Sequence, residues 1–111
     1  MIPITMRHGE RMLKVTQNKV AMRLFRVDTE SASIVWESKR GNSVRLYAVR
    51  DVRVGESARS YRHSLQISDE HEPRWISIIY QTARAYKAVH MVALSDESLA
   101  RWRDSLLRIL A

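Results

Sequence analysis

The stretch SDESLARWRDSLLRILA, residues 95–111, decides the fold class, because it predicts one long amphipathic helix at the end of the chain. Ser95 suits the N-cap position, and Asp96 and Glu97 complement the helix dipole in the first turn. The apolar side chains recur at helical spacing on one stripe: Leu99, Trp102, Leu106, Ile109 and Leu110. The other side carries charge: Arg101, Arg103, Asp104 and Arg108. A closing helix after a series of strands is typical of a small β-barrel plugged at one end.

The residues before this helix alternate between apolar and polar in short runs, which is the pattern of β-strands. Strands are predicted over 12–17, 22–28, 33–38, 44–54, 75–80 and 86–94. The alternation breaks between residues 46 and 49, so the fourth run is expected to form two pieces joined by a bend. A short helix is predicted over 58–65. About seven strands and one helix, without repeat or linker, predict a single domain over 1–111 with its core at about 9–110.

The charge balance indicates the kind of partner. Lys and Arg number 19 against 12 Asp and Glu, a formal net charge of +7 that points to an anionic partner. Phosphorylated lipid headgroups, nucleic acid and acidic proteins all remain open on this ground. The chain has no cysteine, which excludes disulfides and thiolate metal sites and fits a reducing compartment. No apolar run approaches the ~20 residues that a membrane-spanning helix needs.

The sequence offers no catalytic arrangement. There are only three glycines, so a glycine-rich phosphate loop is not expected, and neither paired carboxylates nor a histidine triad follow from the spacing. The metal-capable side chains are too irregularly spaced to predict a metal site: His63, Asp69, Glu70, His71 and Glu72. His90 is expected to be a half-buried structural histidine, and Trp36, Trp75 and Trp102 to belong to the core or the barrel rim. We therefore predict a binding module without catalytic residues, metal or cofactor.

Five segments in order resemble the strands of a known domain. They are MLKV at 12–15, RLFRV at 23–27, IVWESKR at 34–40, VRDVRVG at 49–55 and RWISIIY at 74–80. Together with Trp102 in the closing helix, they resemble the pleckstrin homology (PH) domain of phosphoinositide-specific phospholipase C. The segments ESARSYR at 56–62 and EPRW at 72–75 are most similar to the fungal branch of that family. The resemblance covers roughly residues 9 to 110.

The resemblance implies both a fold and a ligand site. The fold would be a partly open barrel of about seven antiparallel strands in two near-orthogonal sheets, capped by the C-terminal helix. A phosphorylated inositol headgroup would lie between the first hairpin and the turn after the third strand. The implied ligand-binding residues are Lys14, Arg23, Ser38, Lys39 and Arg40, with Lys19 as a compensating cation from the hairpin turn. Thr16 and Ala21 stand where the family would place further cations, so weaker or less selective binding is expected.

The residue types, considered apart from the resemblance, also favour the binding of a phosphorylated ligand. Cations at two neighbouring loops can converge on one polyanion, with Arg as a planar fork and Lys as a point charge. We therefore predict a module that binds phosphoinositide lipids, phosphatidylinositol 4,5-bisphosphate by family, on an anionic membrane surface. The resemblance implies that its host is a phospholipase C or a related signalling protein, which would be cytoplasmic and peripheral to the membrane.

Two alternatives stay open. Because expected cations are missing, the domain could instead be a protein-interaction module with little lipid specificity. A nucleic-acid partner is not expected, since aromatic side chains are not interleaved with cations in a series suited to base stacking. A second set of arginines is assigned to solubility: Arg45, Arg50, Arg53, Arg59 and Arg62.

Overall fold

The computed structural model describes residues 1–38 and 42–111. The closing helix, α3 (Asp96–Leu110), forms where the sequence predicts it. Its first turn is capped by Ser95, whose hydroxyl oxygen accepts the backbone N–H of Ser98 at 3.1 Å. Trp102 and Leu106 are completely or almost completely buried. The amphipathic pattern thus places one face of α3 against the core, as expected.

The described residues form seven antiparallel strands, in agreement with the sequence prediction. The strands are β1 (Glu10–Thr16), β2 (Lys19–Asp28), β3 (Ser33–Trp36), β4 (Asn42–Arg45), β5 (Val49–Val54), β6 (Trp75–Gln81) and β7 (Tyr86–Val92). The predicted bend inside 44–54 is a single helical turn, η1 (Leu46–Ala48), which separates β4 from β5. Asn42, assigned from sequence to a turn, instead begins β4 opposite Trp36.

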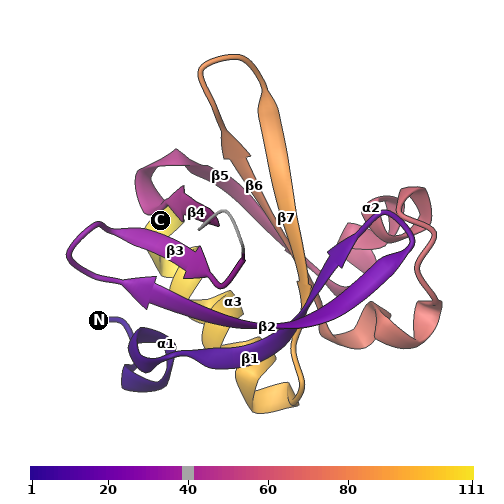
Figure 1. Ribbon diagram of the computed structural model, residues 1–111, viewed down its shortest axis with the longest axis horizontal. Coiled ribbons are helices and arrows are strands. Elements are labelled where there is room, and N and C mark those ends of the chain that lie inside the picture. The colour runs from indigo at the N-terminus through magenta and orange to yellow at the C-terminus, as the bar shows by residue number, and fades with distance from the viewer. Residues whose placement is uncertain (39–41) are drawn as a thin grey trace.

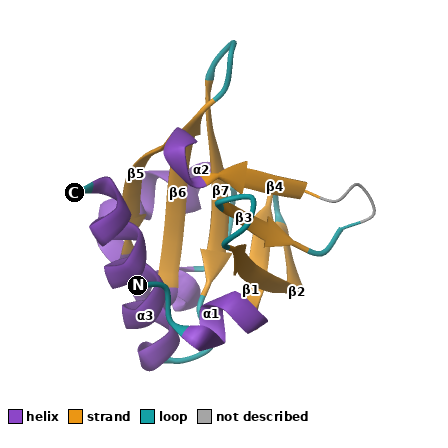
Figure 2. Ribbon diagram, turned by 90° about the vertical axis from the view of Figure 1, so that its left-hand side faces the viewer, coloured by secondary structure: helices purple, strands orange, loops and turns teal. Residues whose placement is uncertain are grey.

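The predicted barrel is confirmed, and its two sheets are the two halves of one continuous hydrogen-bonded sheet. The order is β4-β3-β2-β1-β7-β6-β5, and β1 is the strand that joins the two halves. It pairs with β2 along its whole length and with β7 only from Leu13 to Val15. Because this second ladder is short, the sheet can bend there, and Figure 2 shows β4 running at a steep angle to β6 and β7. The crossing of the two halves that the barrel requires is therefore made by bending one sheet.

The main core lies between the inner face of the bent sheet and α3 (Figure 1). Phe25 is at its centre, with ring-centroid distances of 5.8 Å to Trp36 and 6.5 Å to Trp102. Alternation along the strands supplies the rest of this inner face, including Met12, Met91 and Ile78.

A short helix before β1 also contributes to the core, which the sequence did not predict. In α1 (Ile4–His8), Met6 is fully buried and packs into the main cluster. Gly9 ends this helix with a φ of 121°, a conformation that L side chains rarely adopt. The main core therefore includes a residue of the segment that precedes β1.

The segment between β5 and β6 covers the outer face of the sheet. It contains the single turns η2 (Gly55–Ala58) and η3 (Asp69–Arg74) and the predicted short helix, α2 (Arg59–Ser64). Ala58 and Ile67 pack with Trp75, Val15 and Val92 in a second, smaller cluster. The backbone N–H of Asn18 in the β1–β2 turn donates to the carbonyl of Leu65 at 2.8 Å. The first hairpin is thus fixed on its outer side by this segment.

One arginine of the solubility set is buried in this segment, which corrects the sequence assignment. The Arg62 side chain is only 6% exposed and pairs with Glu72 at 3.0 Å. It also donates to the carbonyl oxygen of Ile67 at 2.9 Å. Arg53, in contrast, pairs with Asp51 at the surface, where the sequence places both.

Candidate functional site

The inner face of the β1–β2 hairpin carries the predicted cations. In the antiparallel register Thr16 is opposite Lys19, Lys14 is opposite Ala21 and Met12 is opposite Arg23. Directly opposed residues project from the same side of a sheet, and Met12 belongs to the core. Lys14, Lys19 and Arg23 therefore all lie on the core-facing side, where the hairpin extends beyond the packed interior.

These side chains surround one cavity of about 130 Å³. The described residues that line it are Lys14, Thr16, Lys19, Ala21, Arg23, Ser38 and Asn42. Four of the predicted site residues, namely Lys14, Lys19, Arg23 and Ser38, are thus brought together around a single space. Lys39 and Arg40 lie outside the described residues. The cavity is below the usual 300–1,000 Å³ of small-molecule sites, so it could hold a charged group at its rim but not enclose a large ligand.

Two of the residues that line the cavity are uncharged, and this limits its positive charge. Thr16 and Ala21, the departures from the family pattern, both line the cavity. A cation at either position would therefore have faced the same space. Asn42 is a lining residue that the sequence analysis missed, because its Gly-Asn context indicated a turn and its pairing partner Trp36 is not adjacent in sequence.

The ammonium group of Lys14 is held close to the core. Its Nζ lies over the Trp36 ring, 5.8 Å from the centroid, which is within the range of a cation–π contact. Burial lowers the pKa of Lys14 below its ordinary value, and the positive charge of Arg23 lowers it further. Both effects disfavour the charged lysine, and a bound anion would relieve the repulsion between the two cations.

In the part of the chain that the structure describes, most arginines outside the cavity form an ion pair with a carboxylate, but the three cations that line the cavity do not. Among the described residues, no carboxylate lies within ion-pair distance of Lys14, Lys19 or Arg23. On the opposite face of the same two strands, Arg11 pairs with Glu37 and Arg26 with Asp28. The hairpin thus has one neutralised face and one face with uncompensated positive charge.

His90 lies near this site but on the outer face of the sheet, half-buried as predicted. Its Nδ1 is 2.7 Å from the Ser77 hydroxyl oxygen, which also accepts the indole N–H of Trp75 at 2.8 Å. Burial lowers the pKa of His90 to about 4, with a further contribution from the charge of Lys14. The histidine is therefore neutral at physiological pH and belongs to a structural hydrogen-bond chain.

A larger cavity of about 420 Å³ lies elsewhere, between the end of β7 and η3. It combines apolar residues such as Leu13 and Leu94 with the carboxylates of Glu70 and Asp96. Arg74 lines the same cavity but is already paired with Asp96 at 3.1 Å, so it is not an uncompensated cation for the anionic ligand class that the net charge indicates.

Within the described residues, no group of three potential metal ligands comes together. Of the predicted metal-capable set, Glu72 instead holds Arg59 at 2.7 Å and Arg62 at 3.0 Å. None of the described helices is both long enough and apolar enough to cross a membrane.

Comparison with known proteins identifies a relative by sequence. No family model matches the chain. It is 29% identical over 100 residues to 1-phosphatidylinositol 4,5-bisphosphate phosphodiesterase 1 of Saccharomyces cerevisiae, a match that covers 82% of this chain. The same match covers 11% of the yeast protein, so the chain spans about a tenth of the length of that relative.

Solved structures with the same fold come from different organisms. PLC21 from S. officinalis and PLC21 from L. pealei each match with a TM-score of 0.73 and 17% identity, over 98% of this chain and 16% of theirs. Inner membrane complex sub-compartment protein 3 from Toxoplasma gondii matches with a TM-score of 0.71 and 9% identity, over 96% of this chain and 77% of its own. At these identities the structural matches establish a shared fold.

Proposed function

Since the chain is a PH-like domain related to phospholipase C, we propose that it binds phosphoinositide headgroups at the cavity of the β1–β2 hairpin. One observation carries the proposal: Lys14, Lys19 and Arg23 line one cavity without a carboxylate partner among the described residues. Cations that the fold leaves uncompensated can be satisfied by the phosphate oxygens of a ligand. Lys39 and Arg40 are proposed as further contributors from the resemblance alone.

The domain would then bring its host to the cytoplasmic face of a membrane. Cations near an anionic leaflet contribute roughly 1 kcal/mol each, so three would give about 3 kcal/mol of attraction before any selectivity. Phosphatidylinositol 4,5-bisphosphate is the proposed lipid, since the yeast relative is named for a phosphodiesterase of that molecule. In this proposal the domain supplies binding only, and catalysis belongs to other parts of a phospholipase C-type host.

The test is co-sedimentation with vesicles that contain single phosphoinositides, with phosphatidylserine vesicles as the control for charge. We expect a preference for one phosphoinositide, and Lys14→Ala/Arg23→Ala should weaken that binding by about 30-fold, from roughly 1 kcal/mol for each cation. The matched control is Arg11→Ala/Arg26→Ala, which removes the same charge from the same strands on the opposite face.

Equal losses in the two double variants would reduce the proposal to a generic basic surface. Absence of binding to every vesicle would overturn it and favour the protein-interaction module. That alternative draws on the uncharged wall of Thr16 and Ala21.

A further inference from the structure

The larger cavity, between the end of β7 and η3, has an apolar lining that is open to solvent. Its volume of about 420 Å³ lies within the roughly 300–1,000 Å³ of small-molecule and peptide-anchor sites. Leu13, Pro73, Val92 and Leu94 supply the apolar part of the lining. Leu94 is 46% exposed, and Pro73 is exposed as well. We call this cavity the β7–η3 groove. Exposed apolar side chains around a cavity mark a surface that another molecule can cover.

The apolar surface continues from the groove across the outer face of the sheet. Leu13 is directly opposite Met22 on one side and Val92 on the other. Directly opposed residues project from the same side of a sheet, so the three side chains form a row across β2, β1 and β7. Met22, at the far end of this row, is 42% exposed. The row is long enough to support an extended chain as well as a single inserted side chain.

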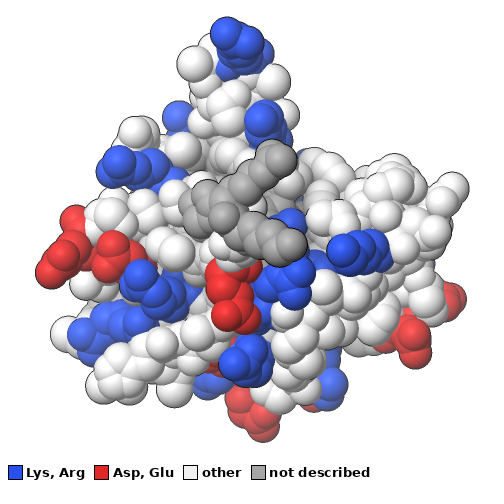
Figure 3. Space-filling model, viewed as in Figure 1, with Lys and Arg blue, Asp and Glu red and all other residues white. Residues whose placement is uncertain are grey.

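Carboxylates surround the β7–η3 groove. Glu70 and Asp96 line it, and Asp69 and Glu97 are their exposed neighbours in sequence. These are four of the 12 acidic residues in a chain whose formal net charge is +7. Figure 3 shows red atoms over η3 and over the start of α3, toward the lower edge of the molecule. The surroundings of the groove are therefore acidic, in contrast to the net charge of the chain.

The positive charge at the groove compensates only part of this acidity. Nε of Arg74 pairs with Asp96 at 3.1 Å, and Nε2 of His71 lies 3.6 Å from Glu70. Within residues 1–38 and 42–111, the other two carboxylates form no ion pair. A cation that entered the groove would thus meet an excess of negative charge.

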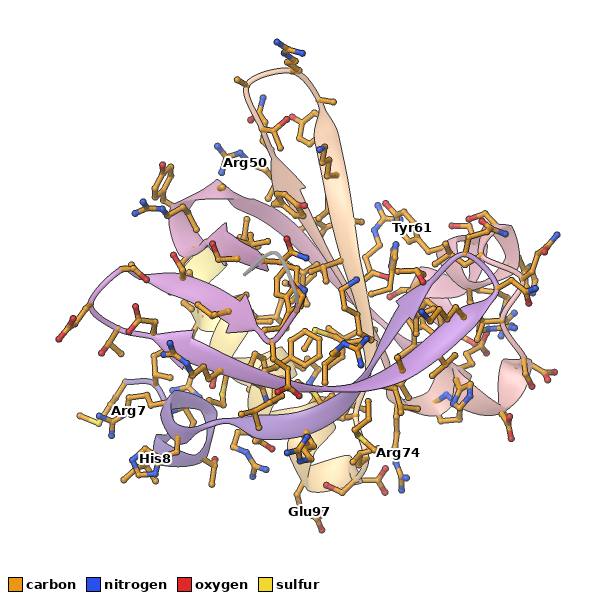
Figure 4. The ribbon with its side chains drawn as sticks, in the orientation of Figure 1. Arg7, His8, Arg50, Tyr61, Arg74 and Glu97 are labelled. Carbon is orange, nitrogen blue, oxygen red and sulfur yellow. The ribbon has the colours of Figure 1, made fainter. Side chains whose placement is uncertain are left out.

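The walls of the groove are held together by hydrogen bonds. Nη1 of Arg74 donates to the carbonyl oxygen of Leu94 at 3.3 Å, and the backbone N–H of Ala93 donates to the carbonyl of Arg74 at 2.9 Å. Together with the pair to Asp96, these bonds fix η3 against the start of α3. Figure 4 shows Arg74 and Glu97 at the same lower edge of the molecule. A groove fixed in this way needs little ordering when a partner binds.

The β7–η3 groove and the headgroup cavity lie on opposite faces of β1. Leu13 lines the groove and Lys14 lines the cavity. Successive side chains of a strand point to opposite faces, so a molecule in one site leaves the other open. The two sites also carry opposite charge, which makes them suited to different partners.

We infer that the β7–η3 groove docks a basic segment of a partner protein, with an apolar side chain inserted between flanking lysines or arginines. This inference does not depend on the proposed headgroup site. The apolar lining would bury the inserted side chain, and the carboxylates would attract its cationic neighbours and set their register. A second copy of this chain is not the expected occupant, because two molecules with a net charge of +7 repel each other.

Fluorescence polarisation with a labelled peptide tests the docking. The probe has one leucine flanked by two lysines on each side, and two control peptides replace either the leucine by glycine or the lysines by glutamate. We expect the leucine–lysine peptide to bind. The glycine peptide should bind at least about tenfold more weakly, because it lacks the side chain that is buried. The glutamate peptide should not compete with the probe.

Charge variants of the protein locate the site. Glu70→Gln/Asp96→Asn should weaken binding of the probe by about tenfold, the effect of losing two exposed charge pairs. The matched control is Glu30→Gln/Asp104→Asn, which also neutralises one carboxylate without an arginine partner and one that is paired with an arginine. We expect this control variant to bind the probe as the wild type does.

A second pair of variants tests the apolar lining. Leu94→Ser should weaken binding of the probe by about tenfold, because less apolar area is covered. Leu107→Ser removes a side chain with the same exposed fraction, 46%, from a position about 20 Å further along the chain on α3, and it should leave binding unchanged. Both positions are at the surface, so neither variant is expected to unfold the domain.

The outcomes separate this inference from the headgroup site. Equal losses in the groove variants and their controls, or failure of the leucine–lysine peptide to bind, would overturn the docking site. Sedimentation velocity that shows self-association, abolished by Leu94→Ser, would assign the groove to a second copy and overturn the partner. Lys14→Ala/Arg23→Ala should retain binding of the probe, so loss of the headgroup site would leave the groove standing. Loss of the probe in that variant would contradict two separate sites.

Discussion

Glu10 joins the first strand to the closing helix, and its removal gives the sharpest stability prediction. Its carboxylate accepts hydrogen bonds from Arg101 Nε and Nη2 at 3.0 and 2.7 Å, from Trp102 Nε1 at 2.8 Å and from Ser98 Oγ at 3.0 Å. The Glu10 side chain is 13% exposed and that of Arg101 is 28% exposed. Glu10→Ala would leave a buried indole N–H and a partly buried guanidinium without their acceptor.

The size of the effect follows from the burial. Removing one partner of a buried ion pair costs about 3–5 kcal/mol, and the partial exposure of Arg101 places this pair at the lower end, near ~3 kcal/mol. At ~2.1 cal/mol/K per residue, that loss lowers the melting temperature of a domain of this size by about 13 °C. Glu10→Gln should cost roughly half as much, because an amide oxygen can still accept the Trp102 N–H.

Chemical denaturation of Glu10→Ala, Arg101→Ala and the double variant measures the coupling between the two side chains. We expect a coupling energy of about 1.5–2 kcal/mol, since charge-assisted hydrogen bonds exceed neutral ones. A Glu10→Ala loss below about 1 kcal/mol, or additive single variants, would refute the argument that this network fastens α3 to β1.

The same network has a defined pH dependence. Burial by itself would raise the pKa of Glu10, but the hydrogen bonds from Arg101, Trp102 and Ser98 outweigh it and hold the pKa below the ordinary 4.5. The stabilisation is therefore complete above pH 4.5 and is lost as the pH falls below that value through the lower folded pKa. The difference in unfolding free energy between wild type and Glu10→Gln should shrink over this acidic range.

Two further predictions concern the histidine beside the site and the first helix. NMR titration of His90 should give a midpoint near the folded pKa of about 4. The unfolded histidine takes up its proton near pH 6.5, so the contribution of His90 to stability falls as the pH drops from 6.5 to about 4. Lys14→Met should raise the midpoint by removing a nearby positive charge, and a wild-type midpoint near 6.5 would contradict the buried, neutral state. Gly9→Ala should destabilise the domain by about 1–3 kcal/mol, because an L residue is strained at a φ of 121° and its Cβ would meet Leu24 at 3.2 Å. Thermal unfolding measures this loss, and an unchanged melting temperature would show that the α1–β1 junction can rearrange.

The sequence alone predicts the features that depend on neighbouring residues. The cap at Ser95 and the stripe containing Trp102 locate α3, because both signals lie within a few helical turns. Alternation locates the seven strands for the same reason, and the break between residues 46 and 49 locates η1. The resemblance assigns Lys14 and Arg23 to one site, with Lys19 as a compensating cation from the hairpin turn, and the antiparallel register places all three on one face of the hairpin.

The tertiary structure decides which distant residues meet. Arg101 appears in the sequence as one more surface arginine, yet it binds Glu10 from 91 positions away. Arg62 is likewise indistinguishable from its exposed neighbours until the segment around η3 brings Glu72 against it. The two halves of the barrel are continuous because β1 exchanges hydrogen bonds with both β2 and β7. Such pairings depend on how the whole chain closes around its core, and local charge and hydrophobicity patterns carry no information about them.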